Sequence, residues 1–554
     1  MVKRFVTLFY REIKGLHQAA YILAIFAFAS QILAIFRDRM LAHTFGAGVE
    51  LDIYYSAFRI PDLLFVLFAS VLSVYVLIPF VVRAKKKSAS DAKKLLGTVF
   101  TAFIFAYLAL VMVLFAATPS IANILFPDLY AQDPETLQTL MRILLIQPLF
   151  LGISSLFGVI TQMQKKFIVY ALSPIIYNVG IIIGIIYFYP LLGLEGLGWG
   201  VVLGAILHML VQLPIFLSST LKFNVLIPNL KELKEVIIVA IPRAITLSLN
   251  QIVLLMLTIF AAAMTLGSVS VFQLAFNLQS VPLTIIGVSY SVAAFPVLAN
   301  YIAEADVIKF REYVQTAFKH IIFWALPITA LIIILRAHIV RLTLGSGNFN
   351  WDDTKLTAAL LAVFVVALVF QSINLLIIRA FYANSNTRTP LLAVSASSLL
   401  SILLAYLAYT HLYNIEQIRS SIEFMFRLQE TRGTEVIMLP LGYVFGIMLQ
   451  TIILLSCLIK VFPGILRNLG RSIGTALLAA LIGGASSYLT LQIIVDGINQ
   501  DTFIGVFLQG STAGIVGVFC VYFTYSITKS QELNEIKSAL NKRFSKLSSL
   551  PRVN

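Results

Sequence analysis

Five arginines lie inside long apolar segments of this chain or close to their ends. They are Arg37, Arg39, Arg59, Arg142 and Arg243. A charged side chain inside a bilayer is costly unless it faces water, a cavity or a partner, so such residues are candidates for function. The guanidinium group is planar, keeps its charge and donates two parallel hydrogen bonds, which suits the oxygens of a phosphate. The chemistry that these residues offer is therefore the binding of an anionic group.

The strongest group of charges lies where the first apolar segment ends and the second begins. Its members are Arg37, Asp38, Arg39, Asp52, Arg59 and Asp62. Asp52 and Arg59 are seven residues apart, so they share one face of a helix. Pro61 removes a backbone donor, and we expect it to open the helix where a polar cavity would need irregular backbone.

Two interpretations of this group remain open. In the structural one, Arg37 and Arg39 reach the outer membrane interface and pair with Asp38, Glu50 and Asp52 as a structural latch. In the functional one, Arg37 and Arg59 line a central polar cavity and hold an anionic head group. The two roles are compatible with one another.

The remaining arginines have weaker patterns. Arg243 directly follows Pro242 at the start of the seventh apolar segment. It is either the counterpart of Arg37 and Arg59 in the second half of the chain or an anchor at the cytoplasmic end of its helix. Arg142 lies near the outer end of the fourth segment, and we interpret it as an interface residue.

The elements that must position these arginines are membrane-spanning helices. Of the 554 residues, 59% are hydrophobic and only 12% are charged, whereas charged residues approach about a quarter of a soluble protein. A span needs about 20 apolar residues, so the chain has room for about fourteen spans and no large soluble domain. The apolar segments cover about 15–35, 53–82, 95–118, 137–161, 168–189, 196–218, 236–266, 270–299, 316–335, 356–378, 390–410, 438–462, 472–495 and 503–527. We therefore expect an all-α polytopic membrane protein.

Basic residues gather in the loops on one side of these segments. About 29 of the 40 lysines and arginines lie there, and the positive-inside rule makes that side cytoplasmic. The opposite loops, here called the acidic side, carry Glu50, Asp128, Asp133, Glu135, Glu195, Asp352, Asp353, Asp496 and Asp501. An even number of spans then places both termini in the cytoplasm. The net charge of +15 is dispersed among the spans, so nucleic-acid binding is not expected.

Several kinds of site are not expected. The two cysteines and six histidines are scattered singly, which gives no disulfide framework and no metal-ligand spacing. No phosphate-binding GxxxxGK[ST] loop occurs, so ATP hydrolysis by this chain is not expected either. We expect a membrane transporter without a resident cofactor, not an enzyme.

The two halves of the chain repeat short motifs in the same order. AFRIP (57–61) and SVYVLIP (73–79) correspond to AFNLQSVP (275–282) and SVAAFP (291–296). Transporters are commonly built from two related bundles, and repeats of six spans run parallel. The expected domains are a six-helix bundle at 1–228, a second at 229–463, two further helices at 464–528 and a basic cytoplasmic tail at 529–554. The loop at 411–437 alternates charged and apolar residues, which predicts a helix on the outer surface.

Two segments resemble the MurJ (MviN) family of lipid II flippases. SQILAIFRDRMLAHTFGAGVELDIYYSAFRIPDLLF (30–65) is similar to the signature of that family, and RAFYANSNTRTP (379–390) is similar to its loop between spans ten and eleven. The first motif is fairly specific, because Arg-Asp, Phe-Gly-Ala-Gly, Asp and Phe-Arg-x-Pro occur in that order. The organisation of six, six and two spans fits as well.

The resemblance implies export of the undecaprenyl-pyrophosphate-linked peptidoglycan precursor across the bacterial inner membrane by alternating access. In that family, arginines of a central cavity hold the pyrophosphate, and the two last spans form a groove for the lipid tail. Membrane potential or a gradient of Na⁺ or H⁺ supplies the drive. We expect this polyprenyl-linked glycan and membrane lipids as partners of a monomeric protein.

The substrate-binding residues carried over from the motif are Arg37, Asp38, Asp52 and Arg59, with Arg243 as the candidate of the second bundle. The chain departs from the family pattern at Gln31, Phe65, Asn277 and Ser280. Charged residues are usual in the family at all four positions. A cavity with fewer charges leaves three alternatives open: a flippase for another polyprenyl-linked oligosaccharide, a cation-coupled small-molecule antiporter, and a scaffold that transports nothing.

Overall fold

The computed structural model describes residues 12, 16–223, 225, 229–467, 469–494 and 502–538. The structure is 88% helical, and these residues contain no strand, which confirms the expected all-α class. Within them, thirteen helical segments are long and apolar enough to cross a membrane. The first apolar segment forms a further helix, whose described part is Leu16–Phe45. The basic residues before residue 16 and after residue 538, together with Asp496 and Asp501, lie outside the described residues.

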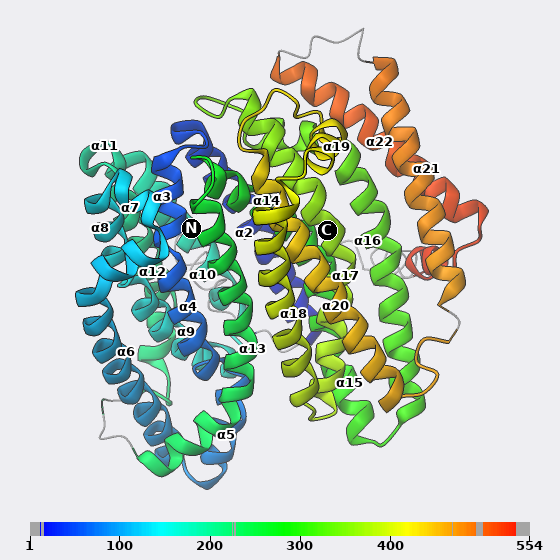
Figure 1. Cartoon of the computed structure of the whole chain (residues 1–554). Coiled ribbons are helices and arrows are strands. Elements are labelled where there is room, and N and C mark those ends of the chain that lie inside the picture. Colours follow the sequence, from blue (N-terminus) through cyan, green and yellow to red (C-terminus); the bar gives the residue numbers. More distant parts are fainter. Residues whose placement is uncertain are drawn as a thin grey trace, which may run out of the picture. The chain divides into compact units, whose positions relative to one another are not determined.

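The helices follow one another along the chain as labelled in Figure 1. The first half contains α2 (Leu16–Phe45), α3 (Val49–Ala57), α4 (Arg59–Val71), α5 (Val74–Lys87), α6 (Ala89–Leu125), α7 (Pro127–Gln132), α8 (Pro134–Leu144), α9 (Gln147–Met163), α10 (Phe167–Ile183), α11 (Tyr189–Leu192) and α12 (Leu194–Ser218). The second half contains α13 (Leu230–Ala262), α14 (Ser268–Leu283), α15 (Ser289–Ala303), α16 (Val307–Thr343), α17 (Trp351–Ala383), α18 (Arg388–Leu407), α19 (Glu416–Phe426), α20 (Met438–Val461), α21 (Gly470–Ile494) and α22 (Phe503–Ile527). Single π-helical turns follow α10, α14 and α18, at Gly184–Phe188, Thr284–Val288 and Ala408–Leu412.

Helix α2 is longer than the apolar pattern predicted. The apolar segment was expected to end near residue 35, but the helix continues to Phe45. Leu41 and Ala42 in this extension are buried within the protein. The prediction failed because hydropathy detects contact with lipid, whereas this last part of the helix is held by protein contacts.

The second apolar segment is interrupted where Pro61 led us to expect an opening. Helix α3 ends at Ala57 and α4 begins at Arg59. Proline cannot donate to the carbonyl four residues earlier, which here belongs to Ala57. Pro61 is tolerated in the first turn of α4, because backbone N–H groups there have no intrahelical acceptor. Asp52 and Arg59 therefore lie on two consecutive short helices.

The described chain separates into two compact units. The first comprises residues 1–277, 343–357 and 390–446, and the second comprises 278–342, 358–389 and 447–554. The division expected at residues 228 and 463 stays a prediction. All residues of the candidate site described below belong to the first unit.

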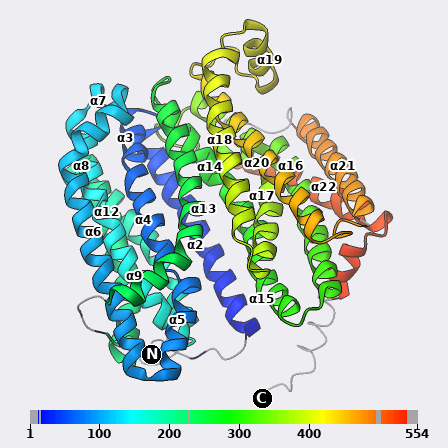
Figure 2. The ribbon, with the colours of Figure 1, turned by 60° about the horizontal axis from the view of Figure 1, so that its bottom comes forward.

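Close contacts between glycines bring α10 and α12 together in the first unit. A Cβ atom added to Gly180 would lie 2.3 Å from the Cα atom of Gly204, and one added to Gly184 would lie 2.5 Å from that of Gly200. Small residues four apart allow two helices to approach closely in a membrane, where dispersion forces and packing replace the hydrophobic effect. Helix α10 also packs against α2, and α4 packs against α13 (Figures 1 and 2). These contacts fix the helices that carry the arginines.

The second unit contains the pair α21 and α22, which pack side by side (Figures 1 and 2). Gly483 and Gly517 lie at their contact, because a Cβ atom added to Gly517 would be 3.1 Å from the Gly483 carbonyl oxygen. The Tyr525 hydroxyl of α22 donates to the Phe323 carbonyl of α16 over 2.7 Å. The two helices expected at 464–528 are thus present and are joined to α16 of their own unit.

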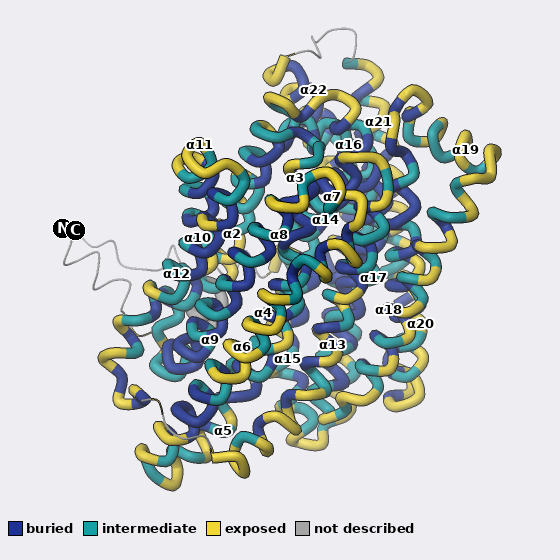
Figure 3. Tube along the Cα trace, turned by 60° about the vertical axis from the view of Figure 1, so that its left-hand side comes forward, coloured by how far each residue is buried: buried dark blue, intermediate teal, exposed yellow. Residues whose placement is uncertain are grey.

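Helix α19 confirms the helix expected within residues 411–437. Its surface is largely exposed (Figure 3), and it contains no buried residue. The Glu423 carboxylate accepts a hydrogen bond from Thr434 over 2.9 Å, which ties the helix to the segment that follows it.

Candidate functional site

Arg37 lies on α2 and joins two neighbours through hydrogen bonds. Its Nε and Nη2 atoms donate to Oδ1 of Asp38 over 2.9 and 2.7 Å. Its Nη1 atom donates to Oδ1 of Asn178, on α10, over 2.9 Å. The Arg37 side chain keeps 19% of its surface exposed, whereas that of Asp38 keeps 7%. Arg37 is therefore paired with one carboxylate and still partly accessible.

A row of amides on α14 continues these bonds from Asp38 to Arg59. Asn277 donates to Oδ2 of Asp38 over 2.9 Å and accepts from Gln273 over 2.6 Å. The Gln273 side-chain oxygen accepts from Nη2 of Arg59. We call the six residues that these bonds connect the arginine network: Arg37, Asp38, Asn178, Asn277, Gln273 and Arg59.

Arg59, at the start of α4, is buried without a paired carboxylate. Only 6% of it is exposed, and among the described residues its Nε atom has no hydrogen-bond partner. The ion pairs of the described residues do not include it. Asp62, one turn further along α4, attracts it only through space. The arginine network thus holds two guanidinium groups against one carboxylate, and a neutral amide faces the second guanidinium.

Asp52, on α3, binds the first turn of α14 instead of an arginine. Its two oxygens accept hydrogen bonds from the backbone N–H groups of Gly267 and Ser270 over 2.7 and 2.8 Å, and from the Ser270 hydroxyl over 2.5 Å. Only 1% of Asp52 is exposed. The N-terminus of a helix presents free donors and the positive end of its dipole, so a carboxylate is stabilised there without a basic partner. Arg37 is thus paired with Asp38, as the structural interpretation expected, whereas Asp52 binds the start of α14 and not an arginine.

Loops of the acidic side meet around the hydrogen bonds of Asp52. Asn348 donates from its backbone to the His43 carbonyl over 3.0 Å and from its side chain to the Thr44 carbonyl over 2.6 Å. The Ala47 backbone N–H donates to Asp353 over 3.3 Å. We call these bonds, together with those of Asp52, the acidic-side contacts.

Glycines with a left-handed backbone make this close approach feasible. Gly46 has φ +65°, and a Cβ atom there would lie 2.5 Å from the Asn348 carbonyl oxygen. Gly267 has φ +93°, and its Cβ atom would lie 2.5 Å from the Ala47 carbonyl oxygen. Any other residue would be strained by its φ and would collide with backbone. The Phe-Gly-Ala-Gly motif (45–48) thus serves the contact between loops.

Comparison with known proteins identifies the family of this chain. The model of the family described as "Lipid II flippase MurJ" matches residues 41–417. This chain belongs to that family.

Curated relatives agree with this membership. The chain is 26% identical over 392 residues to a probable lipid II flippase MurJ of Rhizobium tropici, covering 68% of this chain and 73% of the relative. It is 27% identical over 407 residues to the corresponding protein of Bdellovibrio bacteriovorus, covering 71% and 76%. A lipid II flippase MurJ of Burkholderia cenocepacia is 25% identical over 377 residues, covering 66% and 73%.

Solved structures show the same fold. A lipid II flippase MurJ in an inward closed conformation superposes with a TM-score of 0.73 at 23% identity, covering 92% of this chain and 98% of that one. A multidrug resistance MATE family transporter in an inward-facing conformation superposes with a TM-score of 0.65 at 15% identity, covering 79% and 96%. The fold of the MurJ family is thus shared with a wider group of transporters.

The remaining arginines are placed as follows. Arg243 is partly buried on α13, the helix that packs against α4 and hence against the helix of Arg59. Arg39 is partly buried near the end of α2. The Arg142 guanidinium lies over the Phe115 ring, 4.9 Å from its centroid. Whether these arginines bind substrate stays a prediction, as it does for Arg37 and Arg59.

Sequence reasoning gave no role to the amides that join the arginines. Ser270, Gln273 and Asn277 occupy positions i, i+3 and i+7 of α14, so they lie on one face. This spacing was the available signal, but Asn277 was considered only as the loss of a charge usual in the MurJ family. Asn178 left no signal beyond being a lone polar residue in an apolar segment.

Proposed function

We propose that this protein moves lipid II, the undecaprenyl-pyrophosphate-linked peptidoglycan precursor, from the inner to the outer leaflet by alternating access. Membership of the MurJ family and the names of its curated relatives support this function. The arginine network supports it from the chemistry of the site. The protein acts as a transporter and not as an enzyme.

The single observation that carries the proposal is that the buried Arg59 forms no ion pair with a carboxylate of the described residues. A buried guanidinium without a carboxylate is costly, and an anion that reaches it recovers that cost. A pyrophosphate offers several oxygens to Arg59 and to the partly exposed Arg37, each of which can bind two of them. The head group would then take the place of the amide of Gln273 and of the carboxylate of Asp38.

The arginine network connects this binding step to the acidic-side contacts. When Arg37 turns from Asp38 to the pyrophosphate, Asp38 is no longer held in position to accept the hydrogen bond from Asn277. Helix α2 is then released from α14. The same helix α14 holds Asp52 at its first turn. Substrate binding thereby favours a state in which the acidic side is open, because the substrate interacts more favourably with that state than with the closed one.

The orientation and the drive belong to the same proposal. The basic loops and both termini face the cytoplasm of a bacterium, and the acidic side faces outward. Helices α21 and α22 provide the groove for the lipid tail. Membrane potential or a gradient of Na⁺ or H⁺ returns the empty protein, which works as a monomer.

The test is rescue of cells depleted of their own lipid II flippase. Cells that express the wild-type chain should grow and keep their shape, and cells that express Arg59→Ala at the same level should lyse. Arg419→Ala, on the exposed helix α19, is the matched control and should rescue. Failure of a correctly inserted wild-type chain, while purified protein binds another polyprenyl-pyrophosphate glycan, would overturn lipid II as the substrate.

A further inference from the structure

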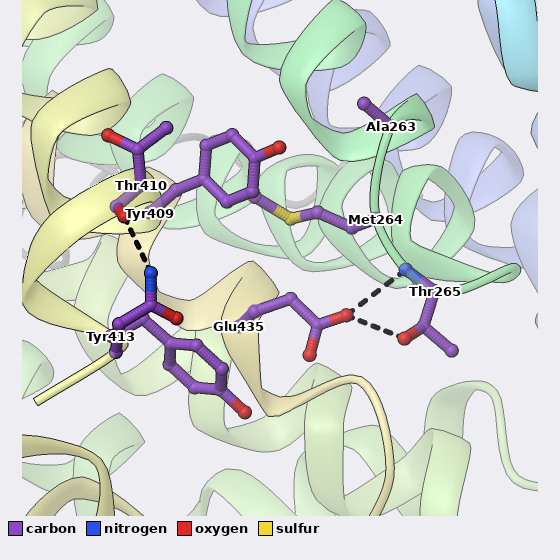
Figure 4. A pocket seen from close by; sticks show the side chains of 8 residues that line it. Ala263, Met264, Thr265, Tyr409, Thr410, Tyr413 and Glu435 are labelled. Carbon is purple, nitrogen blue, oxygen red and sulfur yellow. Dashed lines mark hydrogen bonds between the residues drawn. The ribbon is translucent and has the colours of Figure 1, made fainter. Parts of the chain in front are cut away.

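A pocket between loops of the acidic side of the first unit contains no residue of the arginine network (Figure 4). Its volume is about 470 Å³. We call it the tyrosine pocket, and its lining residues are Ala263, Met264, Thr265, Tyr409, Thr410, Tyr413, Asn414 and Glu435. Glu435 lies beyond the segment that the family model matches, and the proposed function assigns no role to the lining residues.

Several hydrogen-bond donors at the tyrosine pocket are already engaged. The backbone N–H and the hydroxyl of Thr265 both donate to Oε1 of Glu435, over 3.1 and 2.5 Å (Figure 4). The Asn414 side-chain nitrogen donates to the Thr410 carbonyl over 2.7 Å. The Tyr413 hydroxyl is bonded to Thr434 over 2.8 Å.

The tyrosine pocket also contains hydrogen-bond acceptors that are not engaged. Within the described residues, Oε2 of Glu435 and Oδ1 of Asn414 accept no hydrogen bond. The rings of Tyr409 and Tyr413 lie on either side of Glu435 in the view of Figure 4. A ligand that fits these groups must donate hydrogen bonds and must tolerate aromatic faces.

The charge of the lining points to a cation. Its residues include one carboxylate and no lysine or arginine. The ring of Tyr413 already attracts one cation of this chain, since the Arg419 guanidinium lies 5.9 Å from its centroid. Burial raises the pKa of Tyr413 against the effect of its bond to Thr434, and the carboxylates of Glu435 and Glu423 raise it further. Tyr413 is therefore a neutral phenol at physiological pH, and its electron-rich ring attracts cations.

We propose that the tyrosine pocket binds an alkylammonium group, with Glu435 as its counter-ion and the rings of Tyr409 and Tyr413 as its walls. An ammonium group donates up to three hydrogen bonds and is attracted to aromatic faces, which matches the unused acceptors and rings. The group belongs either to a soluble amine or to the ethanolamine head group of a lipid in the same leaflet.

The pocket is joined to the acidic-side contacts through one short turn. Glu435 holds Thr265, and two residues further along the chain the Gly267 backbone N–H binds Asp52. A ligand that binds Glu435 more tightly when these bonds are formed would therefore favour the state in which the acidic side is closed. This coupling rests on the proposed function, but binding of the amine does not.

The experiment measures binding of n-butylammonium to the full-length protein in nanodiscs of phosphatidylglycerol, from the shift in melting temperature and from tyrosine fluorescence. We expect saturable binding, and n-butanol, the neutral analogue, should have no effect. Glu435→Gln keeps an acceptor for Thr265 but removes the charge, and should weaken binding about tenfold. Glu416→Gln, an exposed residue of α19 outside the pocket, should bind as the wild type does.

A second variant and a second lipid keep the test decisive. Tyr409→Leu removes one aromatic wall and should weaken binding even if Glu435→Gln proves unstable. Nanodiscs that contain phosphatidylethanolamine should compete with n-butylammonium if the natural source is a lipid and should leave binding unchanged if it is a solute. Equal responses to n-butylammonium and n-butanol, or undiminished binding by both variants, would overturn the amine site. Loss of flippase rescue with binding intact would overturn only the proposed function.

Discussion

Asp52 and Arg59 lie on consecutive helices and reach the same face of α14, yet they differ in how fully their charged groups are hydrogen-bonded. Asp52 receives three hydrogen bonds from the first turn of α14. Arg59 receives one neutral acceptor and keeps a buried donor without a described partner. A buried charge whose bonds are complete holds two elements together, whereas a buried charge whose bonds are incomplete is available to a ligand. The contrast separates the contacts that close the acidic side from those that would bind a substrate.

The largest effect is expected from Asp52→Ala. It leaves the buried donors of α14 without an acceptor and removes a charge-assisted cap, which should cost about 3 kcal/mol. The melting temperature should fall, and a cysteine introduced at Ser268 should become reactive toward a maleimide. Glu50→Ala, an exposed acidic residue in the first turn of the same helix, is the control. An unchanged melting temperature and an unreactive cysteine would remove Asp52 from the acidic-side contacts.

Gly46→Ala should have the next largest effect. The free energy of unfolding should fall by about 2 kcal/mol, because the new Cβ atom is strained by the left-handed backbone and collides with the backbone of Asn348. The measurement is thermal unfolding of the purified protein. Gly464→Ala separates the two causes, because Gly464 has φ +83° but nothing within 4 Å of its added Cβ atom. If both variants lose the same stability, the approach of Asn348 to Gly46 contributes nothing.

Arg59→Met should leave the melting temperature unchanged or raise it, because the cost of an unpaired buried charge disappears while the volume stays similar. Binding of a polyprenyl-pyrophosphate lipid should weaken at least about tenfold, which corresponds to about 1.4 kcal/mol. Both are measured on the same preparation. A variant that unfolds earlier and binds normally would make Arg59 a structural residue.

Gln273→Glu should give the smallest effect and the sharpest contrast. It supplies the carboxylate that Arg59 lacks, so the protein should become slightly more stable while lipid binding weakens a few-fold. Binding is measured by titration of the lipid. Ser270→Ala, one turn earlier on α14, is the control, since it removes one bond of Asp52 and leaves the surroundings of Arg59 as they are. Tighter binding by Gln273→Glu would contradict the idea that an anion competes for Arg59.

Much of this protein was determined by its sequence alone. Composition and the length of the apolar segments gave the all-α membrane class, because a bilayer requires helices of a certain length. Pro61 marked the break between α3 and α4, since a missing donor acts locally. The motif in residues 30–65 placed Arg37, Asp38, Asp52 and Arg59 together as candidates.

Only the tertiary structure decided which partner each of these residues has. Asp52 meets Gly267, and Arg37 meets Asn178, across large separations in the chain. The lipid-facing and protein-facing sides of such helices are equally apolar, so their pattern does not tell which faces meet. The tyrosine pocket is the extreme case, because Met264, Tyr409 and Glu435 come from three distant segments and converge only through the packing of their helices.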